Sequence, residues 1–413
     1  MRAGDSASGA HWYGTSKKHA RMNSMRVLVS VEMVGTLKAL EKPLELLLKD
    51  GSVNEVRYAA AAAAAKHLTA SDVPYFTLDN DPSATVETMN PHFVIVGAAA
   101  GVATPSGIET SIGLAAMQRG IPVICYRDYS GINDAVAGPL AAHPRAKELL
   151  HFFMFDEATV KAVRDRGYPC AKAIAVGSAA YDGDSTRDWD ALRASARQAL
   201  GLDSCSTLIT FIGGGEKTRV LEALVPTVAG FAKMMEGNPL YRFAPFFHPK
   251  DPDASYMPDP EKKGSYLARP SIYDEVLSPL GDRMFPEPFV RNLVPDSKAR
   301  VAASDLIVMN PLSTDNWTAI YAGTPFVCSA LPLMVAEGAK DGIDVFDLDF
   351  VTADATDVMR TPEELEEYIA MFPRRQTETR NRLRRRMQDM VPKEDAGLRI
   401  LCEILNVAET QIV

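Results

Sequence analysis

Short runs of hydrophobic residues alternate along the chain with segments of helical periodicity. Residues 26–33 form the first apolar run, and leucines recur through residues 37–48 at the spacing of an amphipathic helix. Seven consecutive alanines at 59–65 favour a second helix. Strands of this kind, alternating with helices, predict βαβ units and a parallel sheet. Further apolar runs, each the length of one buried strand, lie at 53–58, 74–78, 92–97, 121–125, 151–155 and 173–177.

The alternation stops in a polar and charged segment, Tyr181–Asp203, which we expect to connect two domains. A surface loop rich in Pro, Asp and Lys is expected at 251–271, and helices close the chain from 362 to 408. Between these segments the strands and helices restart, in the order 206–212, 217–236, 241–247, 294–303, 305–309, 316–322 and 325–328.

The pattern therefore predicts an α/β protein in which two Rossmann-like parallel-sheet domains face each other across a cleft. Residues 1–24 show no apolar periodicity, so we expect a disordered tail there. The first domain is predicted at 25–185 and the second at 186–375. Helices at 376–413 are expected to pack back on the first domain.

Composition and charge exclude several classes of protein. The chain has 413 residues, 46% hydrophobic and 23% charged, which is typical of a soluble globular protein. Its net charge of −9 argues against a chain-wide nucleic-acid surface. No apolar run reaches the roughly 18 residues that span a bilayer. The five cysteines show no CxxC or zinc-type spacing, so we expect reduced thiols, no metal site and a cytoplasmic protein.

Two strand ends in the second domain carry residues suited to binding an anion. Gly213, Gly214 and Gly215 follow a strand and open a helix, so backbone N–H groups and the helix N-terminus would bind a phosphate there. A simple tight turn is the alternative. His248 and Lys250 follow the next strand, where open parallel sheets bind their ligands. A protonated His248 would neutralise a phosphate, although an ordinary surface histidine would have the same sequence.

A third strand end carries Ser313, Thr314 and Asp315, directly before a helix. Their hydroxyl and amide groups would form an anion site, or would only cap the helix. In the first domain, Glu109 and Asp128 each follow a strand, and either carboxylate would serve as a general base for a hydroxyl acceptor. We rank Glu109 first because it opens a helix after a glycine-containing turn. The alternative for each is a structural loop or helix charge.

An arginine-rich helical stretch lies near the end of the chain. Such a face would contact anionic lipid headgroups at a membrane surface, or would be a solvated face with internal ion pairs. Its arginines are Arg374, Arg375, Arg380, Arg382, Arg384, Arg385 and Arg386.

Several of these segments resemble GT-B glycosyltransferase-like proteins. The stretch from Phe155 to Asp182, with its Gly-Tyr-Pro and Val-Gly turns, is similar to the approach to the hinge in that family. His248-Pro249 looks like the family's HP element. Ser313-Thr314, followed by Gly323-Thr-Pro325, looks like its donor-phosphate turn and trailing helix. The resemblance covers roughly residues 26–408.

The resemblance implies a glycosyltransferase that moves a sugar or polyol phosphate from a nucleotide-activated donor to a hydroxyl acceptor. The donor would bind in the second domain and the acceptor near Glu109 and Asp128. No cofactor besides the donor is expected, and no metal, because helix N-termini and His248 would stabilise the departing diphosphate. UDP-sugar 2-epimerases share these elements, so an epimerase is the alternative. A non-catalytic partner subunit is another.

The sequence also departs from the family's patterns. The acidic D/E-D/E-G element of bacterial sialyltransferases is missing, and Gly107-Ile-Glu109-Thr110 is the nearest segment to it. The usual Glu-Ala pair of the donor helix reads Thr318-Ala319. A carboxylate for the donor ribose is therefore not identified by the sequence.

Overall fold

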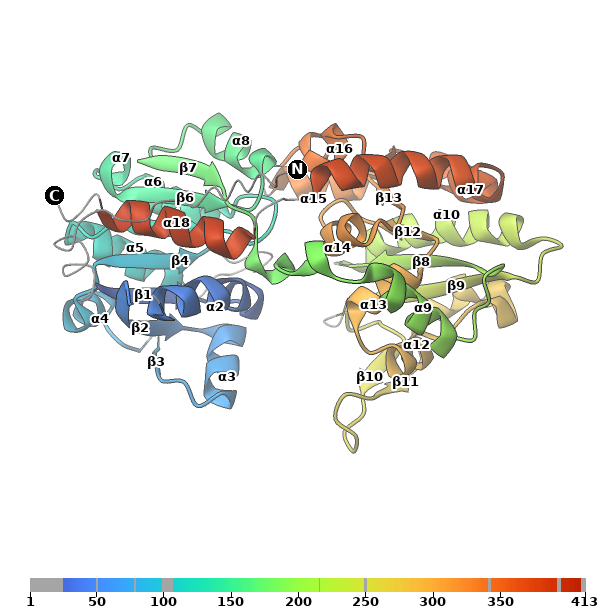
Figure 1. The fold of residues 1–413 in the computed structure, drawn as a ribbon, viewed down its shortest axis with the longest axis horizontal. Coiled ribbons are helices and arrows are strands. Elements are labelled where there is room, and N and C mark those ends of the chain that lie inside the picture. Colours follow the sequence, from blue (N-terminus) through green and yellow to red (C-terminus); the bar gives the residue numbers. More distant parts are fainter. Residues whose placement is uncertain are drawn as a thin grey trace, which may run out of the picture.

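The computed structural model describes residues 25–49, 51–77, 79–98, 107–214, 216–248, 251–340, 343–391 and 395–409. The segment 1–24 and the candidate residues Gly215 and Lys250 lie outside the described residues. The described chain forms two α/β halves side by side, each built around one parallel sheet (Figure 1).

The sheet of the first half has the strand order β3-β2-β1-β4-β5-β6-β7, and all its pairings are parallel. Its strands are β1 (Met25–Val31), β2 (Val53–Ala60), β3 (Tyr75–Phe76), β4 (Phe93–Gly97), β5 (Val123–Tyr126), β6 (Leu150–Met154) and β7 (Lys172–Ala175). Its helices are α2 (Val34–Lys49), α3 (Ala62–Ala70), α4 (Pro82–Met89), α5 (Ile108–Gln118), α6 (Asp134–Ala141), α7 (Ala146–Leu149) and α8 (Glu157–Asp165).

Helices cover both faces of this sheet, which explains why its strands are continuously apolar. Successive side chains of β1 point to opposite faces, so Leu28 packs with Val94 in one core while Val27 and Val29 pack with Ile95 in the other. Helices α4, α5, α6 and α8 contribute to the first core, and α2 and α3 to the second.

The second half contains a five-stranded parallel sheet of order β14-β13-β12-β8-β9 and a small antiparallel β10-β11 hairpin. Its strands are β8 (Thr207–Gly213), β9 (Tyr241–Phe247), β10 (Tyr256–Pro258), β11 (Tyr266–Ala268), β12 (Leu306–Met309), β13 (Phe326–Ser329) and β14 (Asp357–Met359). Its helices are α9 (Trp189–Ala199), α10 (Lys217–Met235), α11 (Asp274–Leu277), α12 (Glu287–Leu293), α13 (Ser297–Ala303), α14 (Asp315–Ala322), α15 (Pro332–Lys340), α16 (Asp349–Thr352) and α17 (Pro362–Met390).

Only the second part of the alanine run, from Ala62, forms the helix that its composition favours. Strand β2 continues through Ala59 and Ala60, which pair with Ser30 and Val31 of β1, and α3 begins only at Ala62. Sheet pairing in a buried position therefore outweighs the intrinsic helix propensity of alanine. The predicted loop at 251–271 likewise contains the β10-β11 hairpin.

The connection between the halves is shorter than we expected from the polar segment Tyr181–Asp203. Two single 3-10 turns, Ala179–Tyr181 and Asp184–Thr186, lead directly to α9, which packs against α13 of the second half. Arg193 and Arg197 of α9 pair with the buried Asp305, at 2.6 and 3.0 Å. Part of the charged character of this segment thus comes from ion pairs with a buried carboxylate.

The two C-terminal helices pack on different halves. Helix α18 (Ala396–Glu409) lies against α2, and its Ile400 and Ile404 join a core of the first half. Residues 376–390, which we expected on the first domain, instead belong to α17 and pack against α10 and α14 of the second half. The reason is local: Leu383 and Met387 are buried there, and Gly230 permits the close approach, since a Cβ at Gly230 would lie 2.5 Å from the Glu366 carbonyl oxygen.

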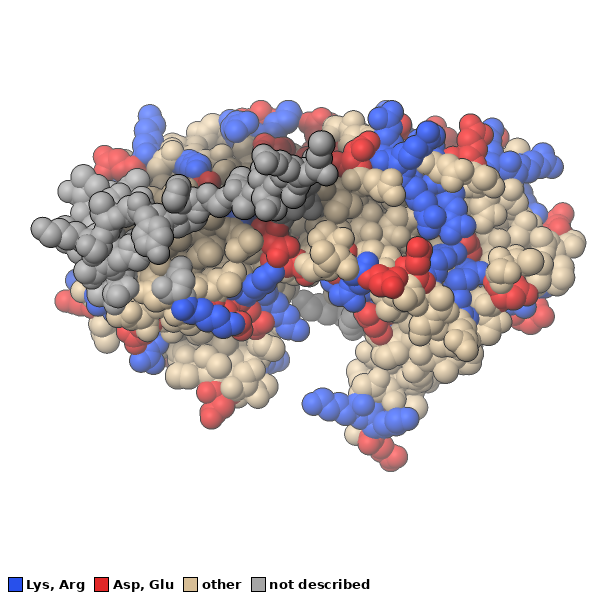
Figure 2. All heavy atoms as spheres, in the orientation of Figure 1, with Lys and Arg blue, Asp and Glu red and all other residues tan. Residues whose placement is uncertain are grey.

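The arginine-rich stretch forms one face of α17, where basic side chains gather on the surface of the second half (Figure 2). Arg382 pairs with Asp357 at 2.5 Å, and Arg384 donates to the Gly323 carbonyl at 2.8 Å. Part of this face is therefore structural. The arginines that stay exposed are Arg374, Arg375, Arg385 and Arg386.

Candidate functional site

A cleft of about 760 Å³ lies between the two halves, and residues of both line it. The surface is visibly hollowed where the halves meet (Figure 2). The first half contributes the segments that follow β1 and β5, and the second half those that follow β8, β9 and β12. Both parallel sheets thus turn the carboxyl ends of their strands to the same space, which is where such sheets bind ligands.

The glycine turn after β8 lies on the wall of the second half. Gly213 and Gly214 line the cleft, directly before α10. A Cβ at Gly213 would lie 2.7 Å from the Phe211 ring, so this position excludes larger residues. The N-terminus of the 19-residue α10, with its unpaired N–H groups, opens beside the turn.

Arg219, in the first turn of α10, is a cation that the sequence analysis did not identify. It lines the cleft next to Gly214 and Asn310. Its Nη1 pairs with Glu337 at 3.0 Å, and its buried Nε has no hydrogen-bond partner among the residues that the structure describes. The sequence shows an arginine one helical turn after a glycine-rich strand end, so Arg219 could have been identified as a candidate from the sequence. The direction of its side chain could not have been predicted.

His248 lies at the end of β9, as expected, and also lines the cleft. The preceding residue is held by a buried ion pair: Glu287 accepts from the Phe247 amide at 2.9 Å, and Arg291 donates to the Phe247 carbonyl at 2.9 Å. Glu287 and Arg291 pair with each other at 2.6 Å. The end of β9 is thereby fixed on both sides, which positions His248.

The turn after β12 brings Ser313, Thr314 and Asp315 to the same wall. The Asp315 amide donates to the Ser313 hydroxyl at 3.3 Å, whereas the Thr314 side chain makes no capping bond. Burial raises the pKa of Asp315, while the charges of Arg300 and Arg291 lower it. Asp315 is therefore a partly buried carboxylate in the field of two guanidinium groups.

Asp128 is the candidate base on the wall of the first half. Its Oδ1 accepts from the Thr36 hydroxyl at 3.0 Å, at the N-terminus of α2. Its Oδ2 lies 3.3 Å from where a Cβ of Gly35 would be, so glycine leaves room for the carboxylate. Burial raises the pKa of Asp128, against the opposing effects of the Thr36 hydrogen bond and Arg127.

Glu109, which the sequence ranked above Asp128, has a different position. Its side chain is fully buried, and its Oε1 accepts from the Glu32 amide at 3.0 Å. Asp128 is one of the described residues that line the cleft, whereas Glu109 does not line it. The Glu109 carboxylate instead fills the space at the end of β4, where a Cβ at Gly97 would lie 2.7 Å from it.

The first half also contacts the turn after β12. The Tyr129 hydroxyl donates to the Leu312 carbonyl, and the Tyr181 hydroxyl donates to the Thr314 carbonyl at 2.9 Å. These bonds tie the Ser313–Asp315 turn to the wall that carries Asp128. Movement of one half relative to the other would therefore have to break these two hydrogen bonds.

Two further properties concern metals and membranes. Within the described ranges, no three His, Cys, Asp or Glu side chains gather in an arrangement that could hold a metal ion. None of the helices in the part of the chain that the structure describes has the length and hydrophobicity that crossing a bilayer requires.

Comparison with known proteins identifies solved structures that have the same fold. No protein-family model matches the sequence, and no curated protein matches it either. Among solved structures, the S. aureus MnaA–UDP co-structure superposes with a TM-score of 0.57 at 12% identity, covering 93% of this chain and 98% of that one. Acinetobacter baumannii MurG gives 0.57 at 12% identity, with coverage of 93% and 100%. A glycosyltransferase from Rickettsia africae gives 0.58 at 9% identity, with coverage of 94% and 99%.

Two facing parallel sheets with a cleft at their strand ends define the GT-B class of fold. The chain has this fold, which GT-B glycosyltransferases share with UDP-GlcNAc 2-epimerases, and the fold predicted from the sequence is confirmed.

Proposed function

We propose that the protein is a metal-independent transferase that moves a sugar or polyol phosphate from a nucleotide-activated donor to a hydroxyl acceptor. The observation that supports this best is the pair of opposed groups in one cleft: Arg219 beside the N-terminus of α10 on one wall, and Asp128 on the other. UDP and UDP-GlcNAc are bound in two structures of the same fold, from S. aureus and Neisseria meningitidis, which favours a nucleotide-sugar donor.

In this proposal the donor's phosphates lie against Gly213, Gly214 and Arg219, where backbone N–H groups and a guanidinium converge. His248 and the hydroxyl groups of the Ser313–Asp315 turn complete the donor site, and Gly215 and Lys250 remain proposed members of it. The Asp315 carboxylate would repel a phosphate, so it is better suited to accept a hydrogen bond from a donor hydroxyl.

The chemistry divides between the walls. Asp128 takes the proton of the acceptor hydroxyl, and the resulting oxygen attacks the anomeric carbon or the phosphorus of the donor. The bond from that centre to the nucleotide's phosphate oxygen breaks, and its electron pair stays on the departing phosphate. Arg219 and the helix N-terminus stabilise this charge where it develops. The raised pKa of Asp128 makes it a stronger base than an ordinary aspartate.

The test begins with calorimetry against UDP, CDP, CMP and GDP to find the nucleotide, followed by turnover of the matching donors. Asp128→Asn should keep nucleotide affinity but lower turnover by about 10²–10⁴, the usual loss for a general base. Glu109→Gln is the matched comparison, because Glu109 is buried and does not line the cleft, and it should lose much less. Full turnover by Asp128→Asn would refute the assignment of the base.

The same experiments identify the alternatives. An epimerase would convert a UDP-sugar to its 2-epimer in the absence of an acceptor, and NMR would detect this conversion. Nucleotide binding without turnover of any donor would mark a non-catalytic binding protein. No binding of any nucleotide would remove the proposed donor site.

A further inference from the structure

The charge around Arg219 is not balanced within the protein. Glu337 of α15 is its acidic partner, at 3.0 Å, and the same carboxylate also pairs with Lys340 at 2.9 Å. Arg219 and Lys340 thus share the carboxylate of Glu337. Among the described residues, the buried Nε of Arg219 has no hydrogen-bond partner. An arginine that is mostly buried with an unused donor is arranged to receive a further anion.

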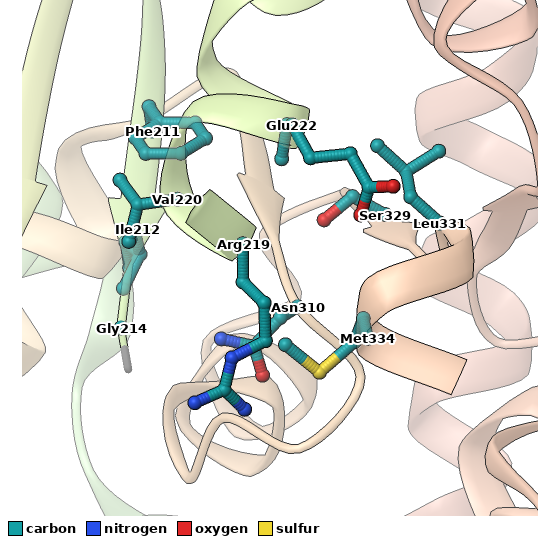
Figure 3. A pocket seen from close by; sticks show the side chains of 12 residues that line it. Phe211, Ile212, Gly214, Arg219, Val220, Glu222, Asn310, Ser329, Leu331 and Met334 are labelled. Carbon is teal, nitrogen blue, oxygen red and sulfur yellow. The ribbon is translucent and has the colours of Figure 1, made fainter. Parts of the chain in front are cut away.

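The close-up view shows how Glu222, the acid of α10 near Arg219, lies relative to the guanidinium (Figure 3). Glu222, three residues after Arg219, is directed away from the guanidinium towards Ser329 and Leu331. Its carboxylate accepts from the Leu333 amide at 3.1 Å, at the start of α15. Arg219 is directed the opposite way, towards Asn310 and Met334, so Glu222 does not neutralise it.

Glu337 has an alternative partner and room to use it. Its side chain is 30% exposed and Lys340 is 72% exposed, whereas Arg219 is only 15% exposed. Burial alone would raise the pKa of Glu337, but hydrogen bonds and charge from Lys340 and Arg219 hold it below its ordinary value. Glu337 is therefore an anion that lines the cleft beside the guanidinium and can turn to Lys340 when another anion arrives.

We infer that Glu337 is an internal competitor for the donor phosphate at Arg219, and that it lowers nucleotide affinity so that the product nucleotide is released. This inference rests on the donor site proposed above. A phosphate that binds the Arg219 guanidinium must displace a negative charge that already occupies one of its edges, and it then lies close to that charge. Glu337 thus favours release of the nucleotide and is not a ligand of the donor.

The inference predicts a gain of affinity, which a residue that merely holds Arg219 in place would not produce. Glu337→Gln should bind the nucleoside diphosphate about tenfold more tightly, since one unit charge near an anion is removed at similar side-chain volume. Lys340→Met should have the opposite effect, because Glu337 then loses its alternative partner. Glu222→Gln is the matched control: it makes the same change of charge one turn away and should leave affinity unchanged.

The measurement is titration calorimetry of the full-length protein with UDP, CDP and GDP, and with inorganic pyrophosphate, after thermal melts confirm folding. If Glu337→Gln binds the nucleotide as tightly as the parent protein or more weakly, the inference is wrong. Nucleotide binding by the parent protein would still support the proposed donor site in that case. If the parent binds no nucleotide, the proposed function falls and pyrophosphate decides the inference. If Glu337→Gln binds pyrophosphate more tightly than the parent protein does, the result supports an anion site at Arg219. If neither protein binds pyrophosphate, the anion site at Arg219 is refuted.

Discussion

Replacing Arg291 by methionine tests the part of the site on which the end of β9 depends. Arg291 and Glu287 form a buried pair, with side chains 8% and 0% exposed. Arg291 also lies over the Tyr256 ring at 4.2 Å. Its removal leaves the Glu287 carboxylate in a buried position with no counter-charge among the described residues, where its remaining hydrogen-bond donors are the Phe247 amide and the Ser255 hydroxyl.

The expected cost follows from that geometry. Breaking a buried ion pair by removing one partner costs about 3–5 kcal/mol of unfolding free energy. The double variant Glu287→Gln/Arg291→Met removes both charges and keeps an acceptor for the Phe247 amide, so it should cost at least about 2 kcal/mol less than Arg291→Met. Because the pair fixes the residue before His248, Arg291→Met should also weaken nucleotide binding.

The cost should depend on pH. Burial raises the pKa of Glu287 to about 7, against the opposing effects of Arg291 and the Phe247 amide. A carboxyl whose folded-state pKa is raised lowers stability as pH rises from its unfolded pKa to its folded pKa. Removing Arg291 raises the folded pKa further, so the destabilisation should be larger at about pH 8 than at about pH 5.5.

The assay is urea unfolding followed by circular dichroism at both pH values, for the parent, Arg291→Met and the double variant. A loss below about 1 kcal/mol for Arg291→Met would contradict the reasoning, because a charge left unpaired in a buried site must cost more. Equal losses for the single and double variants would also contradict it, since the cost would then not come from the orphaned charge.

Two further predictions concern single residues. His248→Ala should weaken binding of the nucleotide found by calorimetry by about 1.5–3 kcal/mol without lowering the melting temperature, and equal affinity would remove His248 from the site. Asp349 accepts from the Glu157 and Ala158 amides across the two halves, and burial together with Asp156 raises its pKa to about 6. Its contribution to stability should therefore fall as pH rises from about 4 to about 6, and Asp349→Asn should flatten that slope in thermal melts recorded across the range.

Much of the fold followed from local pattern. The apolar runs at 26–33 and 305–309 predict buried parallel strands because both faces of such strands are covered, and the structure has strands there at Met25–Val31 and Leu306–Met309. The sequence also placed His248 and the Ser313–Asp315 turn after strand ends, and both line the cleft. Once a chain alternates strands and helices, the edge of the sheet that carries the loops is already determined.

The choice between the two candidate bases required tertiary structure. Glu109 and Asp128 both follow strands, and the local feature that ranked Glu109 first, a helix start after a glycine-containing turn, does not indicate which carboxylate lines the cleft. The segment from the end of β1 into α2 distinguishes them, because the Glu32 amide binds Glu109 while the Thr36 hydroxyl of α2 binds Asp128, which lines the cleft. These partners lie 77 and 92 residues away in sequence, beyond the reach of any local pattern.

The sequence by itself determined the periodic elements and the side of each sheet on which ligand-binding loops lie, because both depend on residues a few positions apart. Tertiary structure alone decided which charges meet. Arg219 faces Glu337 and not Glu222, although Glu222 is nearer in sequence, because α15 packs beside the first turns of α10 and the Leu333 amide takes up Glu222. Long-range packing fixes such pairings, and they set the charge that a substrate encounters in the cleft.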